Sequence, residues 1–83
     1  MLNLQNNVLN ITLPEGKTQQ ELLRMLAQEF EAIEKELYGK EIKINGRVTT
    51  AMCLWLGHKL AHVCKSVSIF DPKENSYILV IKH

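Results

Sequence analysis

Two histidines stand four residues apart in "HKLAHVCK", a segment that runs from His58 to Lys65. On a helix this spacing puts both imidazoles on one face, where they could clasp a metal ion. The zinc-protease pattern is excluded, because Lys59 occupies the place of its glutamate base. Histidines on a buried helix are also commonly packed and hydrogen-bonded without doing chemistry. The spacing therefore leaves a functional and a structural interpretation open.

An aspartate ends the next apolar segment, "SVSIFDPK", which runs from Ser66 to Lys73. The side chain of Asp71 can leave the core at this point and, together with Lys73, could face a ligand. An Asp-Pro pair also commonly begins a turn. The local sequence supports both interpretations equally.

A glycine-arginine pair, Gly46-Arg47, precedes a segment in which Thr49 or Thr50 can cap a helix. An arginine beside the free backbone N–H groups of a helix start is well suited to binding a phosphate. The alternative is a loop arginine that only contacts solvent. No glycine-rich nucleotide-binding loop occurs in the chain.

These residues need a scaffold, and the pattern of the sequence predicts six elements. The clearest is a helix that Thr18 and Glu21 open as a capping box, with one apolar face. The last two predicted strands are most simply paired as an antiparallel hairpin. The predicted segments are strands 8–13, 41–45, 67–70 and 77–81, a helix from 18 to 37, and a helix through 51–63.

The resulting order, β-α-β-α-β-β, predicts a small α/β domain over residues 1–83, with its first three strands parallel. Ligands of such sheets bind at the carboxyl ends of the strands. The loops 46–50 and 71–75 both follow strands, so we expect them to lie near each other. The helix through 51–63 is apolar nearly all round, so we expect it to be largely buried, with another subunit among the surfaces that could cover it.

The composition of the chain indicates which partners the protein can bind and in which cellular compartment it works. A formal charge of +1 argues against binding long nucleic acid, which needs many cations along the phosphate backbone. No signal peptide or membrane-spanning run is present, so we expect a soluble, cytoplasmic protein with no membrane partner. Cys53 and Cys64 are not in a CxxC arrangement, and we expect two reduced thiols rather than a zinc site.

Taken together, "NGR", "LWLGHKLAH", "SVSIFDPK" and "ILVIKH" resemble the third family of CRISPR-associated ring nucleases. These small proteins of type III CRISPR systems degrade cyclic oligoadenylate messengers. The resemblance covers residues 44–83, and the first half of the chain matches only in its element order. It implies a fold distantly related to the Rossmann-like CARF domains that sense cyclic oligoadenylate. It further implies a homodimer, manganese-dependent cleavage of cyclic tetra-adenylate, and pairing of dimers around the ring-shaped substrate.

The resemblance also assigns roles to individual residues. The catalytic histidine of the family falls on His62, its aspartate on Asp71 and the basic residue of its "DPR" turn on Lys73. Lysine keeps the charge of that turn but lacks the bidentate fork of arginine, so phosphate orientation would differ. The glycine-arginine loop of the family falls on Gly46 and Arg47, and the histidine that closes its last strand falls on His83. We expect Thr49 and Thr50 to bind substrate together with Gly46 and Arg47, and Asp71, His58 and His83 to hold a divalent metal, Mn²⁺ in the family.

The leading hypothesis is therefore a metal-dependent phosphodiesterase that opens cyclic oligoadenylate and so switches off antiviral signalling. His62 would move protons, Asp71 would hold the metal, and Arg47 and Lys73 would meet charge on the phosphoryl oxygens. One alternative is a non-catalytic module that senses or sequesters the cyclic nucleotide. Another is a structural dimerisation partner without a ligand, in which His62 would be fully buried.

Overall fold

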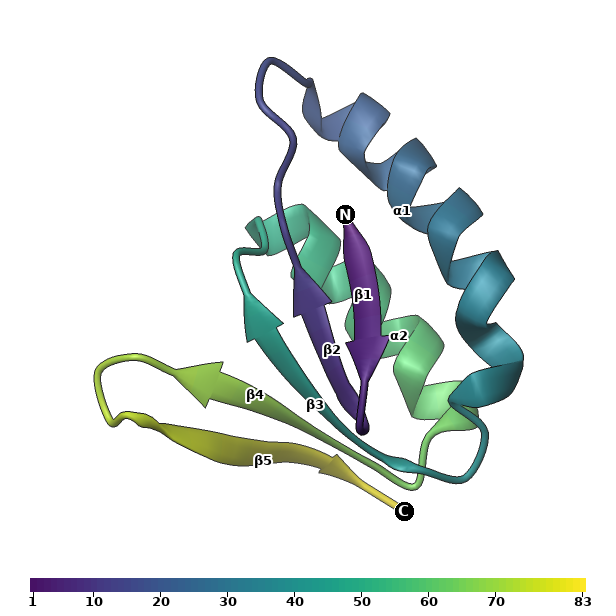
Figure 1. Cartoon of the computed structure of the whole chain (residues 1–83), viewed down its shortest axis with the longest axis vertical. Coiled ribbons are helices and arrows are strands. Elements are labelled where there is room, and N and C mark those ends of the chain that lie inside the picture. Colours follow the sequence, from purple (N-terminus) through teal and green to yellow (C-terminus); the bar gives the residue numbers. More distant parts are fainter.

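Five strands pair side by side in the order in which they follow one another along the chain (Figure 1). The structure, a computed structural model, describes residues 1–83. Two helices and one short 3₁₀ turn connect the strands. In chain order the elements are β1 (Leu2–Gln5), β2 (Val8–Ile11), α1 (Gln19–Ile33), η1 (Glu34–Glu36), β3 (Glu41–Gly46), α2 (Thr50–Val63), β4 (Ser66–Asp71) and β5 (Ser76–Lys82).

The pairing is parallel in the middle of the sheet and antiparallel at both sides. Strands β2, β3 and β4 are parallel, and β4 and β5 form an antiparallel hairpin, as the sequence predicts. Strand β1 pairs antiparallel with β2, and this strand is missing from the predicted order. Asn6 and Asn7 join the two strands with positive φ angles of 50° and 65°, a turn that asparagine tolerates and that suits a tight hairpin. The chain is therefore β-β-α-β-α-β-β.

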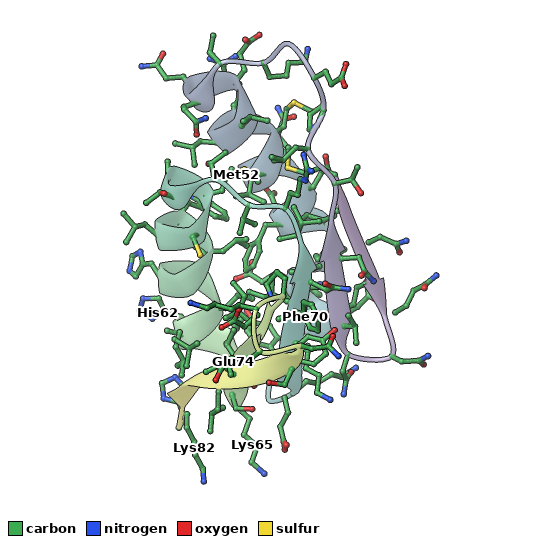
Figure 2. The ribbon with its side chains drawn as sticks, turned by 90° about the vertical axis from the view of Figure 1, so that its left-hand side faces the viewer. Met52, His62, Lys65, Phe70, Glu74 and Lys82 are labelled. Atoms are coloured by element: carbon green, nitrogen blue, oxygen red, sulfur yellow. The ribbon has the colours of Figure 1, made fainter.

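Both helices pack on one face of the sheet and leave the other face uncovered (Figures 1 and 2). Right-handed crossovers between strands that follow in sequential order produce this arrangement. Alternate strand residues point toward the helices, where they form one core. The buried residues are Leu9, Ile11, Leu22, Leu26, Phe30, Leu37, Ile42, Ile44, Met52, Leu56, Leu60, Cys64 and Val67.

Helix α1 begins at the predicted capping box. The hydroxyl of Thr18 accepts a hydrogen bond from the backbone N–H of Glu21, whose carboxylate accepts one from the N–H of Thr18. The α-helix ends at Ile33, earlier than predicted, and η1 carries the chain to Leu37. Gly39 then reverses the chain with a φ of 71°, in the capping position expected for a glycine.

Helix α2 is less buried in the single chain than its composition predicts. Only Met52, Leu56 and Leu60 are buried, whereas Leu54 is 75% exposed. The prediction of a largely buried helix is wrong for one chain, because a helix on the outside of a two-layer fold can bury only one stripe. Neither helix is long and apolar enough to cross a bilayer.

The β4–β5 hairpin projects beyond the rest of the sheet (Figure 1). Pairing between β3 and β4 stops at Ile44 and Ile69, whereas β4 and β5 stay paired as far as Asp71 and Ser76. The rings of Phe70 and Tyr77 pack edge to face across the hairpin, with their centroids 5.3 Å apart. A bulge at Val80 of β5, opposite Val67 and Ser68 of β4, shifts the register of the two strands and increases their twist.

Candidate functional site

The glycine-arginine loop is held against the neighbouring strand β2. Gly46 ends β3 with a φ of 109°, and a Cβ at this position would lie 2.2 Å from the carbonyl oxygen of Ile11. The backbone N–H of Arg47 donates to that same oxygen over 3.1 Å. Only glycine fits here, and the close backbone contact fixes where the exposed Arg47 side chain leaves the sheet.

Arg47 and Gly46 line a hollow of about 410 Å³ at the carboxyl ends of β2 and β3, together with residues 11–15. We call it the loop hollow. The next residues start α2, with Thr49 as its N-cap: the Thr49 hydroxyl accepts from the N–H of Met52 and donates to Gln19. Thr50 is exposed at the first position of the helix. The loop hollow lies where the topology predicts a ligand, and its free guanidinium favours an anion.

The two histidines contact each other on the solvent-exposed face of α2. Their Nε2 atoms lie 3.1 Å apart and both side chains are exposed, so neither ring belongs to the core. Figure 2 shows His62 pointing away from the sheet. In a hydrogen bond between them, one Nε2 carries the hydrogen and the other supplies the lone pair. The predicted shared helix face is confirmed, and both rings are accessible to a ligand.

Asp71 ends β4 and organises the turn that follows. One of its carboxylate oxygens accepts a hydrogen bond from the backbone N–H of Lys73 over 2.9 Å, and Asn75 completes the turn with a φ of 52°. The turn role that an Asp-Pro pair suggests is therefore present. The second carboxylate oxygen makes no hydrogen bond within the chain, and the Lys73 side chain is exposed and outside any ion pair. Both groups can still reach a ligand.

One chain does not bring all the candidate residues together. Strand β4 starts three residues after the end of α2 and runs about 17 Å to Asp71. Asp71 and Lys73 therefore lie far from His62, at the tip of the hairpin (Figure 1). His83 lies back at the start of β4, where its backbone N–H donates to the carbonyl oxygen of Lys65.

The loops 46–50 and 71–75, which the sequence predicts to lie near each other, lie apart in the structure. The hairpin turn contributes no residue to the loop hollow, because the hairpin leaves the sheet after Ile69. The predicted metal ligands, Asp71, His58 and His83, do not form a set within one chain. No group of three or more His, Cys, Asp or Glu side chains is placed to hold a metal ion. The side chains of a single chain are therefore not arranged to coordinate the expected divalent metal ion.

A second hollow, on the uncovered face of the sheet, was not predicted. Its volume is about 410 Å³, and three lysines and two serines make its lining mainly polar. We call it the lysine hollow. Its floor is formed by Ser66 and Ser68 of β4, which pair with longer residues on both neighbouring strands. The lining residues are Glu41, Ile42, Lys43, Lys65, Ser66, Ser68, Leu79 and Lys82.

The lysines of this hollow are free of carboxylate partners. The only ion pair in the chain joins the amino group of Met1 to Glu29 over 3.4 Å. Lys43 instead lies over the ring of Tyr77, with its Nζ 5.2 Å from the ring centroid. Figure 2 shows Lys65 and Lys82 extending from the same end of the molecule. The lysine hollow could have been predicted from the alternation in "EIKI" and "SVSI", because this alternation places Lys43 and both serines on the same face of the sheet.

Two groups have clearly shifted pKa values, and neither is a candidate site residue. Burial raises the pKa of the Cys64 thiol to about 11. Hydrogen bonds from Thr18 lower the pKa of Glu21. Both shifts belong to the scaffold, since Cys64 is in the core and Glu21 is in the capping box.

With this geometry described, the chain can be compared with known proteins. No model of a protein family, no curated protein and no solved structure matches it.

Proposed function

We propose that the protein is a ring nuclease that cleaves cyclic oligoadenylate, with cyclic tetra-adenylate as its expected substrate, and so ends type III CRISPR antiviral signalling in the cytoplasm. The observation that carries the proposal is the exposed His58–His62 pair, with its Nε2 atoms 3.1 Å apart. A purely structural role for the helix requires a buried His62, and His62 is exposed. The family resemblance of residues 44–83 supplies the substrate class.

The histidine pair suits proton transfer at a phosphodiester. Attack of a ribose 2′-oxygen on the adjacent phosphorus forms a 2′,3′-cyclic phosphate and breaks the bond to the 5′-oxygen. The 2′-hydroxyl must lose a proton, and the leaving 5′-oxygen must gain one. Imidazole can act as a base and as an acid, so two rings whose Nε2 atoms lie 3.1 Å apart can take up the first proton and supply the second.

Cations near the transferred group would lower the barrier further. Arg47 is exposed at the edge of the loop hollow, beside the first turn of α2, where it can bind phosphate oxygens of the ring. Lys73 is a second free cation, two residues from the carboxylate of Asp71. Positive charge that meets the charge developing on the phosphoryl oxygens is commonly the largest single contribution to such catalysis.

The separation of His62 from Asp71 implies that a complete site draws on more than one chain. We therefore include a homodimer, and assembly of dimers around the ring, in the proposal. The parallel strands β2 to β4 with helical crossovers support a distant relation to Rossmann-like CARF domains. Manganese dependence is part of the proposal as the resemblance implies it, and no step is assigned to the metal, because one chain offers no ligand set.

The test is to incubate the purified protein with cyclic tri-, tetra- and hexa-adenylate, with and without Mn²⁺, and to separate the products by chromatography. Linear products ending in a 2′,3′-cyclic phosphate are expected. His62→Ala should abolish cleavage, and His62→Gln should too, because an amide keeps a hydrogen bond but cannot carry the proton. Both variants should keep the wild-type oligomeric state. The proposal fails if folded, dimeric wild-type protein leaves every ring intact under all these conditions.

A non-catalytic binding module is the second candidate, and the loop hollow favours it. The guanidinium of Arg47, which lines the loop hollow together with Glu15, can hold a phosphate without help from the distant His62. Calorimetry would then show affinity for a cyclic oligoadenylate without turnover, and Asp71→Ala would leave the affinity unchanged. Loss of affinity in Arg47→Ala would place the ring at the loop hollow.

A further inference from the structure

The lysine hollow lies on the face of the sheet that no helix covers (Figures 1 and 2). The His58–His62 pair lies on the other side of the molecule, on the solvent-exposed face of α2. The loop hollow lies at the opposite end of the parallel strands, because Gly46 ends β3 whereas the lysine hollow is built on Glu41 to Lys43 at its start. The lysine hollow is therefore separate from the residues of the proposed ring-nuclease site.

The register of the strands explains why lysines border this hollow. Lys43 pairs with Ser68 on one side of β4, and Lys82 pairs with Ser66 on the other side. Two strands and two residues separate the two lysines, so their Cα atoms lie about 12 Å apart on the same face. The serine side chains between them are short, which leaves an open space. Lys65 lines the same space.

The charge of the hollow is not balanced within the chain. Three lysines and one carboxylate, that of Glu41, line it, which gives the hollow a net formal charge of +2, whereas the whole chain carries +1. None of the three ammonium groups is in an ion pair. The hydroxyls of Ser66 and Ser68 make no hydrogen bond within the chain. Gathered like charges repel each other, so an anion between them would be bound favourably.

The type and spacing of these groups indicate the kind of anion. An arginine fork fixes one planar orientation, whereas an ammonium group donates hydrogen bonds in three directions and binds as a point charge. Ammonium groups on both sides of β4 therefore suit oxygens that point in several directions, as those of linked phosphoryl groups do. The volume of about 410 Å³ falls within the range of small-molecule sites, about 300–1,000 Å³.

We propose that the lysine hollow binds a small ligand that contains a diphosphate group. Lys43 would bind one phosphoryl group and Lys82 the other, and Lys65 would add a third positive charge. The hydroxyls of Ser66 and Ser68 would donate hydrogen bonds from the floor. Free pyrophosphate and an organic diphosphate share this chemistry. The proposal does not depend on ring-nuclease activity, since the site lies away from both the histidine pair and the loop hollow.

Calorimetry with sodium pyrophosphate tests the site. We expect a dissociation constant below about 1 mM at low ionic strength, and weaker binding as salt is added. Lys43→Met and Lys82→Met should each weaken binding roughly tenfold, because each removes a hydrogen bond to a charged group. Lys17→Met is the matched control: it removes the same charge from the exposed turn before α1 and should leave the affinity unchanged. No binding, or equal weakening by all three variants, would overturn the proposal.

Neutralising a carboxylate gives a test of the opposite sign. Glu41→Gln should strengthen pyrophosphate binding several-fold, because it removes the one negative charge from the lysine hollow. Glu15→Gln is its control, since Glu15 lines the loop hollow instead, and it should have no effect. Tighter binding by Glu15→Gln with no change in Glu41→Gln would place the anion beside Arg47 and refute the proposal.

Nuclear magnetic resonance locates the bound anion. The amide signals of Ser66 and Ser68 should shift most during a titration with pyrophosphate, whereas those of His58 and His62 should stay in place. Shifts confined to α2 or to residues 46–50 would contradict the site.

A short series of ligands tests the diphosphate itself. Inorganic phosphate should bind at least about tenfold more weakly than pyrophosphate, because it reaches the lysines on only one side of β4. Equal affinity for the two anions would show that a second phosphoryl group is not recognised, and the proposal would fail. ADP that binds at least as tightly as pyrophosphate identifies an organic diphosphate as the ligand class. ADP that binds at least tenfold more weakly identifies free pyrophosphate.

Discussion

At the scale of single residues, the contact between His58 and His62 constrains the tautomers of the two rings. The 3.1 Å separation of their Nε2 atoms accommodates one proton between the rings. If both Nε2 atoms carried a hydrogen, the contact would have two donors and no acceptor. The contact is stable only while one ring supplies a lone pair.

This geometry predicts unequal tautomers at neutral pH. One ring should carry its proton on Nε2, and the other should carry it on Nδ1, because its Nε2 accepts the hydrogen bond. Nitrogen-15 spectra of the imidazole rings measure the tautomers directly. His83, which has no ring partner, serves as the internal reference. Two identical tautomers in the pair would contradict the contact.

The two cysteines should differ sharply in reactivity. Cys53 is exposed, whereas Cys64 is buried and its pKa is raised to about 11, so its thiol stays protonated. We expect a thiol reagent to label one group per folded chain at pH 8 and two per unfolded chain. Mass spectrometry of the labelled peptides identifies Cys53 as the first. Fast labelling of Cys64 in the folded protein would be the opposite result.

The raised pKa of Cys64 also gives stability a pH dependence of known sign. The folded state favours the neutral thiol, whereas the unfolded chain ionises near the ordinary value of 9.0. The contribution of Cys64 is therefore complete below pH 9 and is lost as the pH rises toward 11. Thermal unfolding of the wild type should weaken over this range more than that of Cys64→Ala. Cys53→Ala, changed at an exposed site, should follow the wild type.

At the scale of elements, the close contact between β2 and β3 fixes the start of the candidate substrate loop. Gly46 allows the backbones to approach because it has no side chain. The same position begins the turn toward Arg47 and α2. Strand pairing and placement of the loop thus depend on one glycine.

Two glycine-to-alanine changes should have opposite effects. Gly46→Ala should destabilise the fold by more than about 2 kcal/mol, because its positive φ and the contact with Ile11 leave no room for a methyl group. Gly57→Ala, inside α2 with nothing within 4 Å of the added Cβ, should stabilise it by about 0.5–1 kcal/mol. Chemical denaturation measures both. Equal effects at the two positions would show that the tight contact is not required.

The periodicity of apolar residues predicted most of these elements from the sequence. It did not predict features that depend on how the elements pack together. The capping box and apolar stripe placed α1, and the spacing of His58 and His62 placed their contact. Strand β1 was missed although Asn6-Asn7 between two alternating runs is a hairpin signal. The exposure of Leu54 was unpredictable, because a helix that is apolar all round does not reveal which side the sheet covers. The divergence of the 46–50 and 71–75 loops depends on sheet twist, which a sequence pattern does not encode.

At the scale of the whole molecule, local stability should follow the position of each strand in the sheet. Strand β3 has a paired strand on both sides and the core on one face, so its amides should exchange with solvent most slowly. The outward amides of β1 and β5, the two edge strands, should exchange faster. Hydrogen exchange read by mass spectrometry measures this order, and edge amides as slow as those of β3 would be the opposite result.

The coincidence of strand order with chain order has a consequence for how the protein folds. Every strand pairs with the one before it, so no strand has to insert between two that are already paired. The two hairpins close short loops, whereas the parallel pairing of β2 with β3 (Val8 with Lys43) and of β3 with β4 (Glu41 with Ser66) closes longer loops and forms more slowly. During synthesis the β1–β2 hairpin can form first and each later strand can extend the growing edge. Strand β5 would join last, so this edge of the sheet is complete only when the rest of the fold is already in place.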